Sequence, residues 1–345
     1  MAKKVKYKSL LSAKELVLIA VFFLAVLAVF YFTFFTPNYY SQISPVTFEV
    51  KKGESFSHIT NRLYDAHIIP GKFNFKVAGI IYGALTKIRP ARYYIPNGLS
   101  YLDLIEYFVS GKADYLKTVR LYDGSSSKSF ASRLRVELYI DSISFLNEVK
   151  NRKLLDSLGI HESSFEGYLL PQDYDLYERS SPQEIIGILY KRFKNFMNDT
   201  LKEEIALRNY NVHSVLTMAS IVNGETNKKE EMARIAGVYY NRLKIGMKLQ
   251  ADPTIQYLQP NGSKRLSYED LKLNSPYNTY KYSGLPPEPI DNPGKNAIIA
   301  AVYPEKHHYL YFVADGKGGH NFARTFTEHL KNVQLYRDNL KSSSK

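Results

Sequence analysis

The sequence contains no cysteine and no tryptophan among its 345 residues, and each absence removes a class of chemistry. Without cysteine the chain has no disulfide bond, no thiol nucleophile and no cysteine-ligated zinc, and it can fold in an oxidising or a reducing compartment. Without tryptophan, an aromatic platform for sugars or bases must come from the 29 tyrosines and 19 phenylalanines. The length suffices for about two domains at roughly 150 residues each.

Charged residues are missing altogether between residues 16 and 35. A helix of this length spans about 30 Å, the thickness of the hydrocarbon core of a bilayer, so the segment 16–36 is predicted to be a transmembrane helix. The apolar region of a cleaved signal peptide is shorter and ends at a small-residue cleavage site, whereas this run ends in bulky residues. The preceding segment 1–15 has five lysines and one glutamate, which predicts a cytoplasmic basic tail and an exported remainder.

Acidic residues are the scarcer charge, 33 against 46 basic residues, and the net charge of the chain is +13. Because the flank 1–15 contributes +4 of this, the remainder carries +9. A basic exported part favours contact with an anionic cell wall or lipid over binding of nucleic acid.

The exported part is predicted to have an α+β fold in two modules. A polar, proline-bounded stalk at 37–45 precedes a small α/β module at 46–117, and a larger mixed α+β domain follows at 118–340 with a short tail at 341–345. The segments 48–63 and 119–134 align without gaps, and both predict a strand, a glycine turn and a serine-capped helix. In the larger domain, helical patterns occupy 181–197, 213–222 and 232–243, and a β-rich stretch is expected from 250 to 322.

The segment 213–222 is apolar around most of its circumference, which indicates a buried core helix. Asn223 and Gly224 are expected to end it, so that Glu225 lies just past its C-terminus at the rim of the core. Partial burial and the negative end of the helix dipole would both raise the pKa of this carboxyl group, as a general acid requires. The alternative is an ordinary solvated glutamate at a helix end.

Downstream of Glu225 the sequence is dense in amides, hydroxyls and turn formers. Polar groups in an apolar frame suit a sugar, although such residues also form loops that bond to their own backbone. The pair His307-His308 and the lone His320 lack a metal-ligand spacing, and the glycine-rich segment 315–319 lacks the Walker order. No metal and no other cofactor is expected.

Several ordered motifs together resemble the YceG-like family of membrane-anchored endolytic murein transglycosylases. They are Glu166-Gly-Tyr-Leu-Leu-Pro, Ala219-Ser-Ile-Val-Asn-Gly-Glu-Thr, Asn241-Arg-Leu, Gly246-Met-Lys-Leu-Gln-Ala-Asp-Pro-Thr, Tyr277-Asn-Thr-Tyr, Gly284-Leu-Pro-Pro, Asn292-Pro-Gly, Tyr309-Leu-Tyr-Phe-Val-Ala and Gly319-His-Asn-Phe. The resemblance implies that the module 46–117 is LysM-like, with Tyr93, Tyr94 and Tyr101 as candidate rings for sugar stacking.

The resemblance places the family's catalytic glutamate on Glu225. Many members have Glu-x-Glu-Thr where this sequence has Asn223-Gly-Glu-Thr, so Glu225 is the one carboxylate left in the motif. The reaction implied is cleavage between N-acetylmuramic acid (MurNAc) and N-acetylglucosamine (GlcNAc) in nascent peptidoglycan. It leaves 1,6-anhydroMurNAc ends and terminates glycan strand elongation. The residues expected to bind substrate are Gln250, Asp252, Thr254, Asn278, Tyr280 and His320.

The resemblance also implies a single-pass protein of the inner membrane with a periplasmic or extracytoplasmic catalytic part. Peptidoglycan glycan strands are the expected substrate, and peptidoglycan synthases of the elongation or division machinery are the expected protein partners. Two alternatives remain open: a muramidase-type hydrolase that uses Glu225 with Asp252, and a non-catalytic membrane-anchored protein that binds peptidoglycan.

Overall fold

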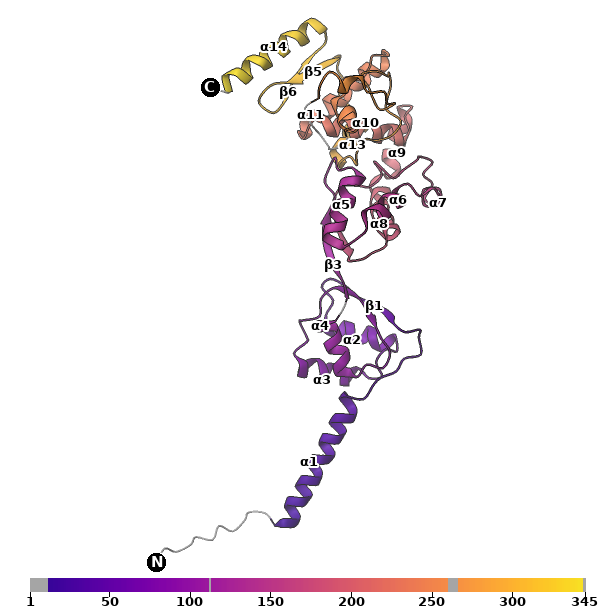
Figure 1. The fold of residues 1–345 in the computed structure, drawn as a ribbon, viewed down its shortest axis with the longest axis vertical. Coiled ribbons are helices and arrows are strands. Elements are labelled where there is room, and N and C mark those ends of the chain that lie inside the picture. The colour runs from indigo at the N-terminus through magenta and orange to yellow at the C-terminus, as the bar shows by residue number, and fades with distance from the viewer. Residues whose placement is uncertain (1–11, 112, 260–265, 344–345) are drawn as a thin grey trace, which may run out of the picture. The chain divides into compact units, whose positions relative to one another are not determined.

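The computed structural model describes residues 12–111, 113–259 and 266–343 (Figure 1). The chain divides into two compact units, residues 1–116 and 117–345. The predicted basic tail is therefore described only from Ser12 onward, and the predicted C-terminal tail only as far as residue 343. Helices and strands occur in both units, so the mixed α+β class predicted from the sequence is confirmed.

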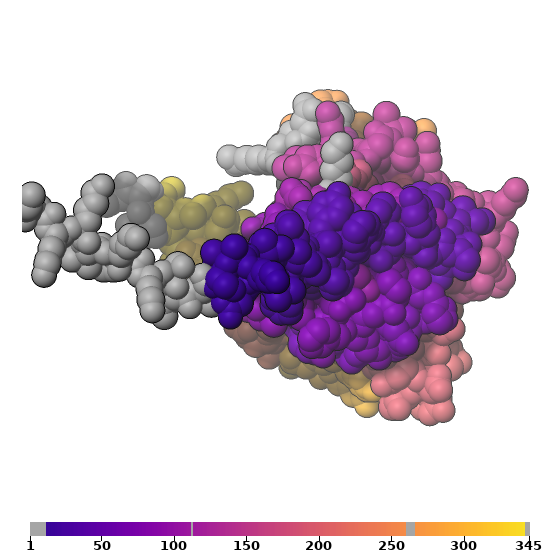
Figure 2. Space-filling view, turned by 90° about the horizontal axis from the view of Figure 1, so that it is seen from below, coloured from indigo at the N-terminus to yellow at the C-terminus, as the bar shows by residue number. Residues whose placement is uncertain are grey.

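The first helix, α1 (Ala13–Phe34), is the only one in the described ranges that is long and apolar enough to cross a membrane. It begins with a capping box, in which the Ser12 backbone N–H donates to the Glu15 carboxylate at 2.6 Å. Its side chains are exposed along nearly the whole length, and only Phe34 at its C-terminal end is buried in the core of unit 1. Figure 1 shows α1 projecting from the rest of this unit, and Figure 2 shows its surface in indigo.

Unit 1 is a three-stranded antiparallel arrangement covered by helices. Its elements are β1 (Val46–Val50), α2 (Phe56–Asp65), α3 (Lys72–Tyr82), β2 (Ala91–Ile95), α4 (Tyr101–Ser110) and the start of β3 (Ala113–Arg120). β2 pairs with β1 on one side and with β3 on the other. Tyr93 and Tyr101 are buried in the core, so the prediction that they are candidate rings for sugar stacking is wrong. Tyr94 is partly exposed, and its hydroxyl donates to Asp114 at 2.8 Å.

The two aligned sequence segments adopt the same local structure, as predicted. Gly53 and Gly124 have φ values of +78° and +76°, the left-handed region that glycine tolerates best. Two residues later, Ser55 and Ser126 accept hydrogen bonds from backbone N–H groups in the first turns of α2 and α5 (Ser127–Leu138).

Unit 2 is predominantly helical around one large core. Its helices are α5, α6 (Ser142–Val149), α7 (Arg152–Ser157), α8 (Pro182–Phe196), α9 (Asp199–Leu207), α10 (Val212–Glu225), α11 (Lys229–Lys244), α12 (Asp252–Gln256), the 3-10 helix η1 (Asp270–Lys272), α13 (Lys295–Val302) and α14 (Phe326–Ser343). The predicted helical segments at 181–197, 213–222 and 232–243 are confirmed as α8, α10 and α11. α10 packs against both α11 and α13 at the centre of the core.

Strands are fewer in unit 2 than predicted. β4 (Asp173–Tyr177) lies beside β3, and β5 (Tyr311–Ala314) pairs with β6 (His320–Ala323) in an antiparallel hairpin. The prediction of a β-rich stretch from 250 to 322 is therefore wrong, because this stretch also holds α12, η1 and α13. Between the helices, the described loops of this stretch are held by bonds from side chains to backbone groups, such as those of Asn278 and Asn292.

Candidate active site

α10 is the buried core helix that its composition predicts. Every residue from 215 to 223 is buried. The helix begins at the cap Asn211, whose side chain accepts a 2.8 Å hydrogen bond from the Ser214 backbone N–H. Because neighbours surround the helix on all sides, they fix the direction of its C-terminal turn.

The last turn of α10 carries three residues that are each held by a different segment. The helix continues through Asn223 and Gly224 and ends at Glu225, so the prediction that Asn-Gly stops it earlier is wrong. Packing requires Gly224, because a Cβ atom there would lie 2.6 Å from the Cβ of Pro253 in α12. Asn223 is buried, and its Oδ1 accepts a 3.1 Å bond from the Gly294 backbone N–H. The glycine thus permits close contact between α10 and α12.

Glu225 itself is partly buried and faces α11. Its Oε1 accepts a 2.5 Å hydrogen bond from the Tyr239 hydroxyl. Burial raises the pKa of the Glu225 carboxyl group to about 7, and the charge of Asp252 adds to the increase. The Tyr239 bond and the charge of Arg242 act in the opposite direction. A carboxyl group with this pKa is protonated in much of the population near neutral pH and can act as an acid.

Arg242 lies one turn after Tyr239 on α11 and is buried. Its Nε donates to the Leu310 carbonyl at 2.6 Å and its Nη1 donates to the Leu249 carbonyl at 2.5 Å. Sequence reasoning assigned no role to Tyr239 or Arg242. Their spacing of three within a predicted helix is the signal that could have placed them on one face.

Two of the six residues predicted to bind substrate lie beside Glu225. The Tyr280 hydroxyl donates to Asp252 Oδ1 at 2.5 Å, and burial together with this bond raises the pKa of Tyr280. The charge of Asp252 contributes to the raised pKa of Glu225, and the charges of both carboxylates contribute to the raised pKa of Tyr280. Gln250 precedes Asp252, is exposed, and has a positive φ of 49°. These side chains form the accessible edge of the site.

Two other predicted residues are fully buried. Thr254 Oγ1 donates to a backbone carbonyl at 2.8 Å and lies 2.9 Å from Thr279 Oγ1. The Asn278 amide donates to two backbone carbonyls of the segment 271–273, at 2.9 and 2.7 Å. Thr254 and Asn278 thus bond to groups of the protein itself, Thr254 within the helix that begins at Asp252 and Asn278 within the loop that carries Tyr280.

The sixth predicted residue, His320, begins β6 and is paired with Glu231 of α11. His320 Nδ1 lies 2.8 Å from Glu231 Oε2, and both side chains are 14% exposed. The Phe312 ring lies between this pair and the Glu225 cluster, with centroid distances of 5.4 Å to His320 and 5.7 Å to Tyr239. His320 is thus a neighbour of the cluster across one aromatic ring.

Two further carboxyl groups, the partly buried Glu166 and the buried Asp291, lie in the same unit. Glu166 accepts bonds from the Ser127 backbone N–H at 2.9 and 3.1 Å and from Asn292 Nδ2 at 2.8 Å. Burial raises the pKa of Glu166 to about 7, and it also raises that of Asp291. The bonds of Glu166 join the start of α5 to the loop before α13. Within the described residues, no three histidine, aspartate or glutamate side chains are placed to hold a metal ion.

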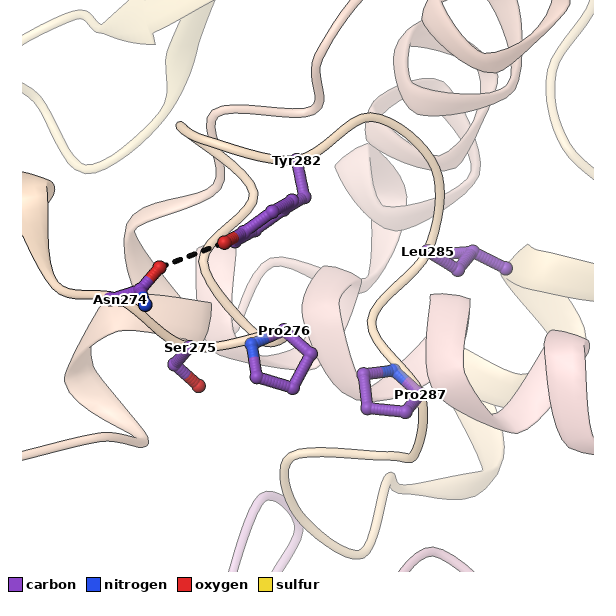
Figure 3. A pocket seen from close by; sticks show the side chains of 6 residues that line it. All are labelled: Asn274, Ser275, Pro276, Tyr282, Leu285 and Pro287. Carbon is purple, nitrogen blue, oxygen red and sulfur yellow. Dashed lines mark hydrogen bonds between the residues drawn. The ribbon is translucent and has the colours of Figure 1, made fainter.

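A shallow pocket of about 460 Å³ lies on the segment that also carries Tyr280. Figure 3 shows the Tyr282 hydroxyl directed at the Asn274 side chain, with a bond of 2.8 Å. Pro276, Leu285 and Pro287 supply its apolar surface. An aromatic ring, an amide and an apolar wall are the groups with which proteins bind sugars.

Comparisons with known proteins identify the relatives of this chain. The model of the YceG-like family matches residues 48–335. An endolytic murein transglycosylase of Bacillus subtilis (strain 168) is 31% identical over 307 residues, which cover 84% of each chain. An endolytic murein transglycosylase of Streptococcus pneumoniae serotype 2 (strain D39) is 29% identical over 320 residues, which cover 84% of this chain and 58% of that one.

A solved structure is also similar to this chain. It is the crystal structure of a yceG-like protein from Listeria monocytogenes, which matches with a TM-score of 0.60 and 28% sequence identity. The match covers 83% of this chain and 98% of the Listeria chain. With the family model matched over most of its length, the chain belongs to the YceG-like family.

Proposed function

We propose that this chain is an endolytic lytic transglycosylase that cleaves the MurNAc-GlcNAc bond within nascent peptidoglycan strands. The observation that carries the proposal is the Glu225 carboxyl group, partly buried and with a pKa raised to about 7, in a family whose relatives are named endolytic murein transglycosylases. Cleavage inside a nascent strand would end its elongation.

Glu225 can serve as both acid and base in this reaction. It first gives its proton to the glycosidic oxygen, and the bond between that oxygen and C1 of MurNAc breaks. The resulting carboxylate takes the proton from the O6 hydroxyl of the same MurNAc, and O6 bonds to C1 to close the 1,6-anhydro ring. The proton returns to Glu225 and no water is consumed. One carboxyl group with a pKa near neutrality suffices for both transfers.

The neighbours of Glu225 have distinct parts in this proposal. Tyr239 holds the carboxyl group through its 2.5 Å bond, and the buried charge of Arg242 stabilises the carboxylate after the first proton transfer. Gln250, Asp252 and Tyr280 contact the sugar at the accessible edge. Thr254 and Asn278 position the segments that carry Asp252 and Tyr280, since their own polar atoms are bonded within the protein. His320 packs against the Phe312 ring, which in turn packs against Tyr239, and so helps to position Tyr239.

A muramidase that uses Glu225 with Asp252 is the second candidate function. The observation that favours it is the electrostatic effect of Asp252 on Glu225, since a glycoside hydrolase normally has a second carboxylate within about 5 to 9.5 Å. The bond from Tyr280 ties up one oxygen of that carboxylate, which makes Asp252 a poorer nucleophile or base. The transglycosylase therefore remains the preferred function.

We also propose that α1 anchors the chain in the cytoplasmic membrane with its N-terminus inside. Its length, apolar surface and exposure within unit 1 support a membrane span, and the lysines of the segment 1–15 support the orientation. The module 46–117 is proposed to be a LysM-like tether for glycan strands. Peptidoglycan synthases that extend these strands are the proposed protein partners.

Product analysis tests the proposed function. The full chain, purified in a neutral detergent, is incubated with isolated sacculi, and the released muropeptides are weighed by mass spectrometry. Anhydro ends are expected with the unaltered chain, and Glu225→Gln is expected to lower the rate by about 10²- to 10⁴-fold. Reducing muramyl ends, together with a loss of activity in Asp252→Asn, would favour the muramidase. If no cleavage occurs, the result would favour the third alternative, a non-catalytic protein that binds peptidoglycan.

A further inference from the structure

A second cavity, of about 550 Å³, lies on the face of α11 opposite the Glu225 cluster. α11 directs Tyr239 toward Glu225, while Gly237, Tyr240 and Lys244 of the same helix line the cavity. At 3.6 residues per turn Gly237 and Lys244 lie on the far side of the helix from Tyr239, about 160° and 140° around its axis, and Tyr240 lies about 100° around it. The cavity is therefore separate from the site proposed for cleavage.

The wall of this cavity is rigidly built. The Asn241 amide donates to the carbonyls of His307 and Tyr309 at 2.9 and 3.0 Å and so fixes the segment 304–309 against α11. Gly237 permits this approach, because a Cβ atom there would lie 2.5 Å from the Glu305 carbonyl oxygen. The Tyr240 hydroxyl is fixed as well, through a 3.0 Å bond to a backbone carbonyl of α13. The concave shape is thus present before any ligand arrives.

Positive charge dominates the lining. Arg208, Lys244, Lys306 and Arg324 all border the cavity. Among the described residues of the lining, Glu305 supplies the one carboxylate, and it is already paired with the Arg234 guanidinium at 3.0 Å.

Several of these cations lack a carboxylate in an ion pair, or a hydrogen-bond acceptor, within the described residues. No ion pair within 4.0 Å joins Lys244 or Lys306 to a carboxylate there, whereas the backbone N–H and the charge of Arg324 both lower the pKa of the neighbouring Glu328. Arg208 lies 3.7 Å from Glu204, but its buried Nε has no hydrogen-bond acceptor. The cavity therefore keeps an excess of positive charge that a bound anion can neutralise.

We propose that this cavity binds a phosphodiester chain, that is, a flexible polymer with one negative charge on each phosphate. Four cations around one cavity suit a ligand with several negative charges, and arginine and lysine are the usual partners of phosphate oxygens. The concave, preformed wall admits a single polymer chain better than the flat surface of a bilayer. Such binding would let the enzyme grip an anionic polymer lying beside its glycan substrate.

The test is a titration of the full chain, in neutral detergent micelles, with a defined oligomer of glycerol phosphate. The triple variant Lys244→Ala, Lys306→Ala, Arg324→Ala is expected to bind at least 10-fold more weakly than the unaltered chain. A charge-matched control removes the same number of lysines and arginines from the exposed surface of α8: Lys191→Ala, Arg192→Ala, Lys194→Ala. This control is expected to bind within 2-fold of the unaltered chain, and so is Glu225→Gln.

The other outcomes overturn the proposal. Equal weakening in both triple variants would mean that net charge alone attracts the oligomer. Failure of the unaltered chain to bind the oligomer, with binding only to phosphatidylglycerol vesicles and not to phosphatidylcholine vesicles, would assign the patch to a membrane surface. Circular dichroism checks the fold of each variant, and the single exposed change Lys306→Glu repeats the test if the triple variant unfolds.

Discussion

Replacing Glu225 with glutamine should stabilise the fold while it removes activity, and the gain should depend on pH. Burial raises the pKa of this group from an ordinary value of 4.5 to about 7. Between these pH values the folded chain keeps a proton that the unfolded chain releases, so the free energy of unfolding falls as the pH rises. Above about pH 7 the loss is complete, and at about 1.4 kcal/mol per pKa unit it reaches about 3 kcal/mol.

Glutamine is nearly isosteric and cannot ionise, so the variant avoids this loss. Its Oε1 can still accept the bond from the Tyr239 hydroxyl. Relative to the unaltered chain, Glu225→Gln should gain little at pH 4 and up to about 3 kcal/mol at pH 8. For a domain of about 150 to 250 residues, each kcal/mol corresponds to about 2–4 °C in Tm, so the gain at pH 8 should be several degrees.

The measurement is thermal unfolding of the full chain in neutral detergent micelles, followed by circular dichroism at pH 4 and pH 8. Glu203→Gln on the exposed surface of α9 is the control and should leave Tm unchanged at both pH values. If Glu225→Gln shows the same Tm difference at both pH values, the carboxyl group is not held protonated by the fold. The proposed role of Glu225 as the acid would then be refuted.

Two further predictions concern the turn that carries Glu225. Tyr239→Phe removes a bond that lowers the pKa of Glu225, so the alkaline pH at which the cleavage rate declines should move to a higher value. An unchanged pH profile of the cleavage rate would contradict the assigned bond. Gly224→Ala places a Cβ atom 2.6 Å from Pro253 and should cost about 1–3 kcal/mol and most of the activity. Gly187→Ala is the matched control in α8, where a Cβ atom meets no neighbour within 4 Å, and it should leave Tm unchanged or raise it slightly. Equal losses in the two alanine variants, measured by circular dichroism and muropeptide release, would show that contact with Pro253 does not matter.

The sequence predicted those features that depend on local pattern. The apolar composition of 213–222 identified a buried helix, and the serines at 55 and 126 identified two helix starts, because caps and buried faces depend on neighbours in the chain. The sequence predicts that Glu225 lies just past the end of its helix, whereas Glu225 is the last residue of α10. Gly224 does not end the helix; it permits the close approach of Pro253, a residue far away in the sequence.

The roles of residues that act through tertiary contacts could not be predicted from the sequence. Tyr239 and Arg242 were assigned no role, because nothing local shows which face of α11 meets the end of α10. Thr254 and Asn278 have the residue types that bind sugars, but the same hydroxyl and amide groups also satisfy buried backbone carbonyls. Only the folded chain distinguishes these uses.

The two backbone bonds of Arg242 have a consequence for the order in which the enzyme becomes complete. One accepting carbonyl, that of Leu249, lies seven residues further along the chain, and the other, that of Leu310, lies 68 residues further along. A chain emerging N-terminus first therefore exposes Glu225 well before the second partner of Arg242 exists. The buried cation beside the carboxyl group is locked in place only when nearly the whole polypeptide has been made, so a half-synthesised chain lacks the finished site.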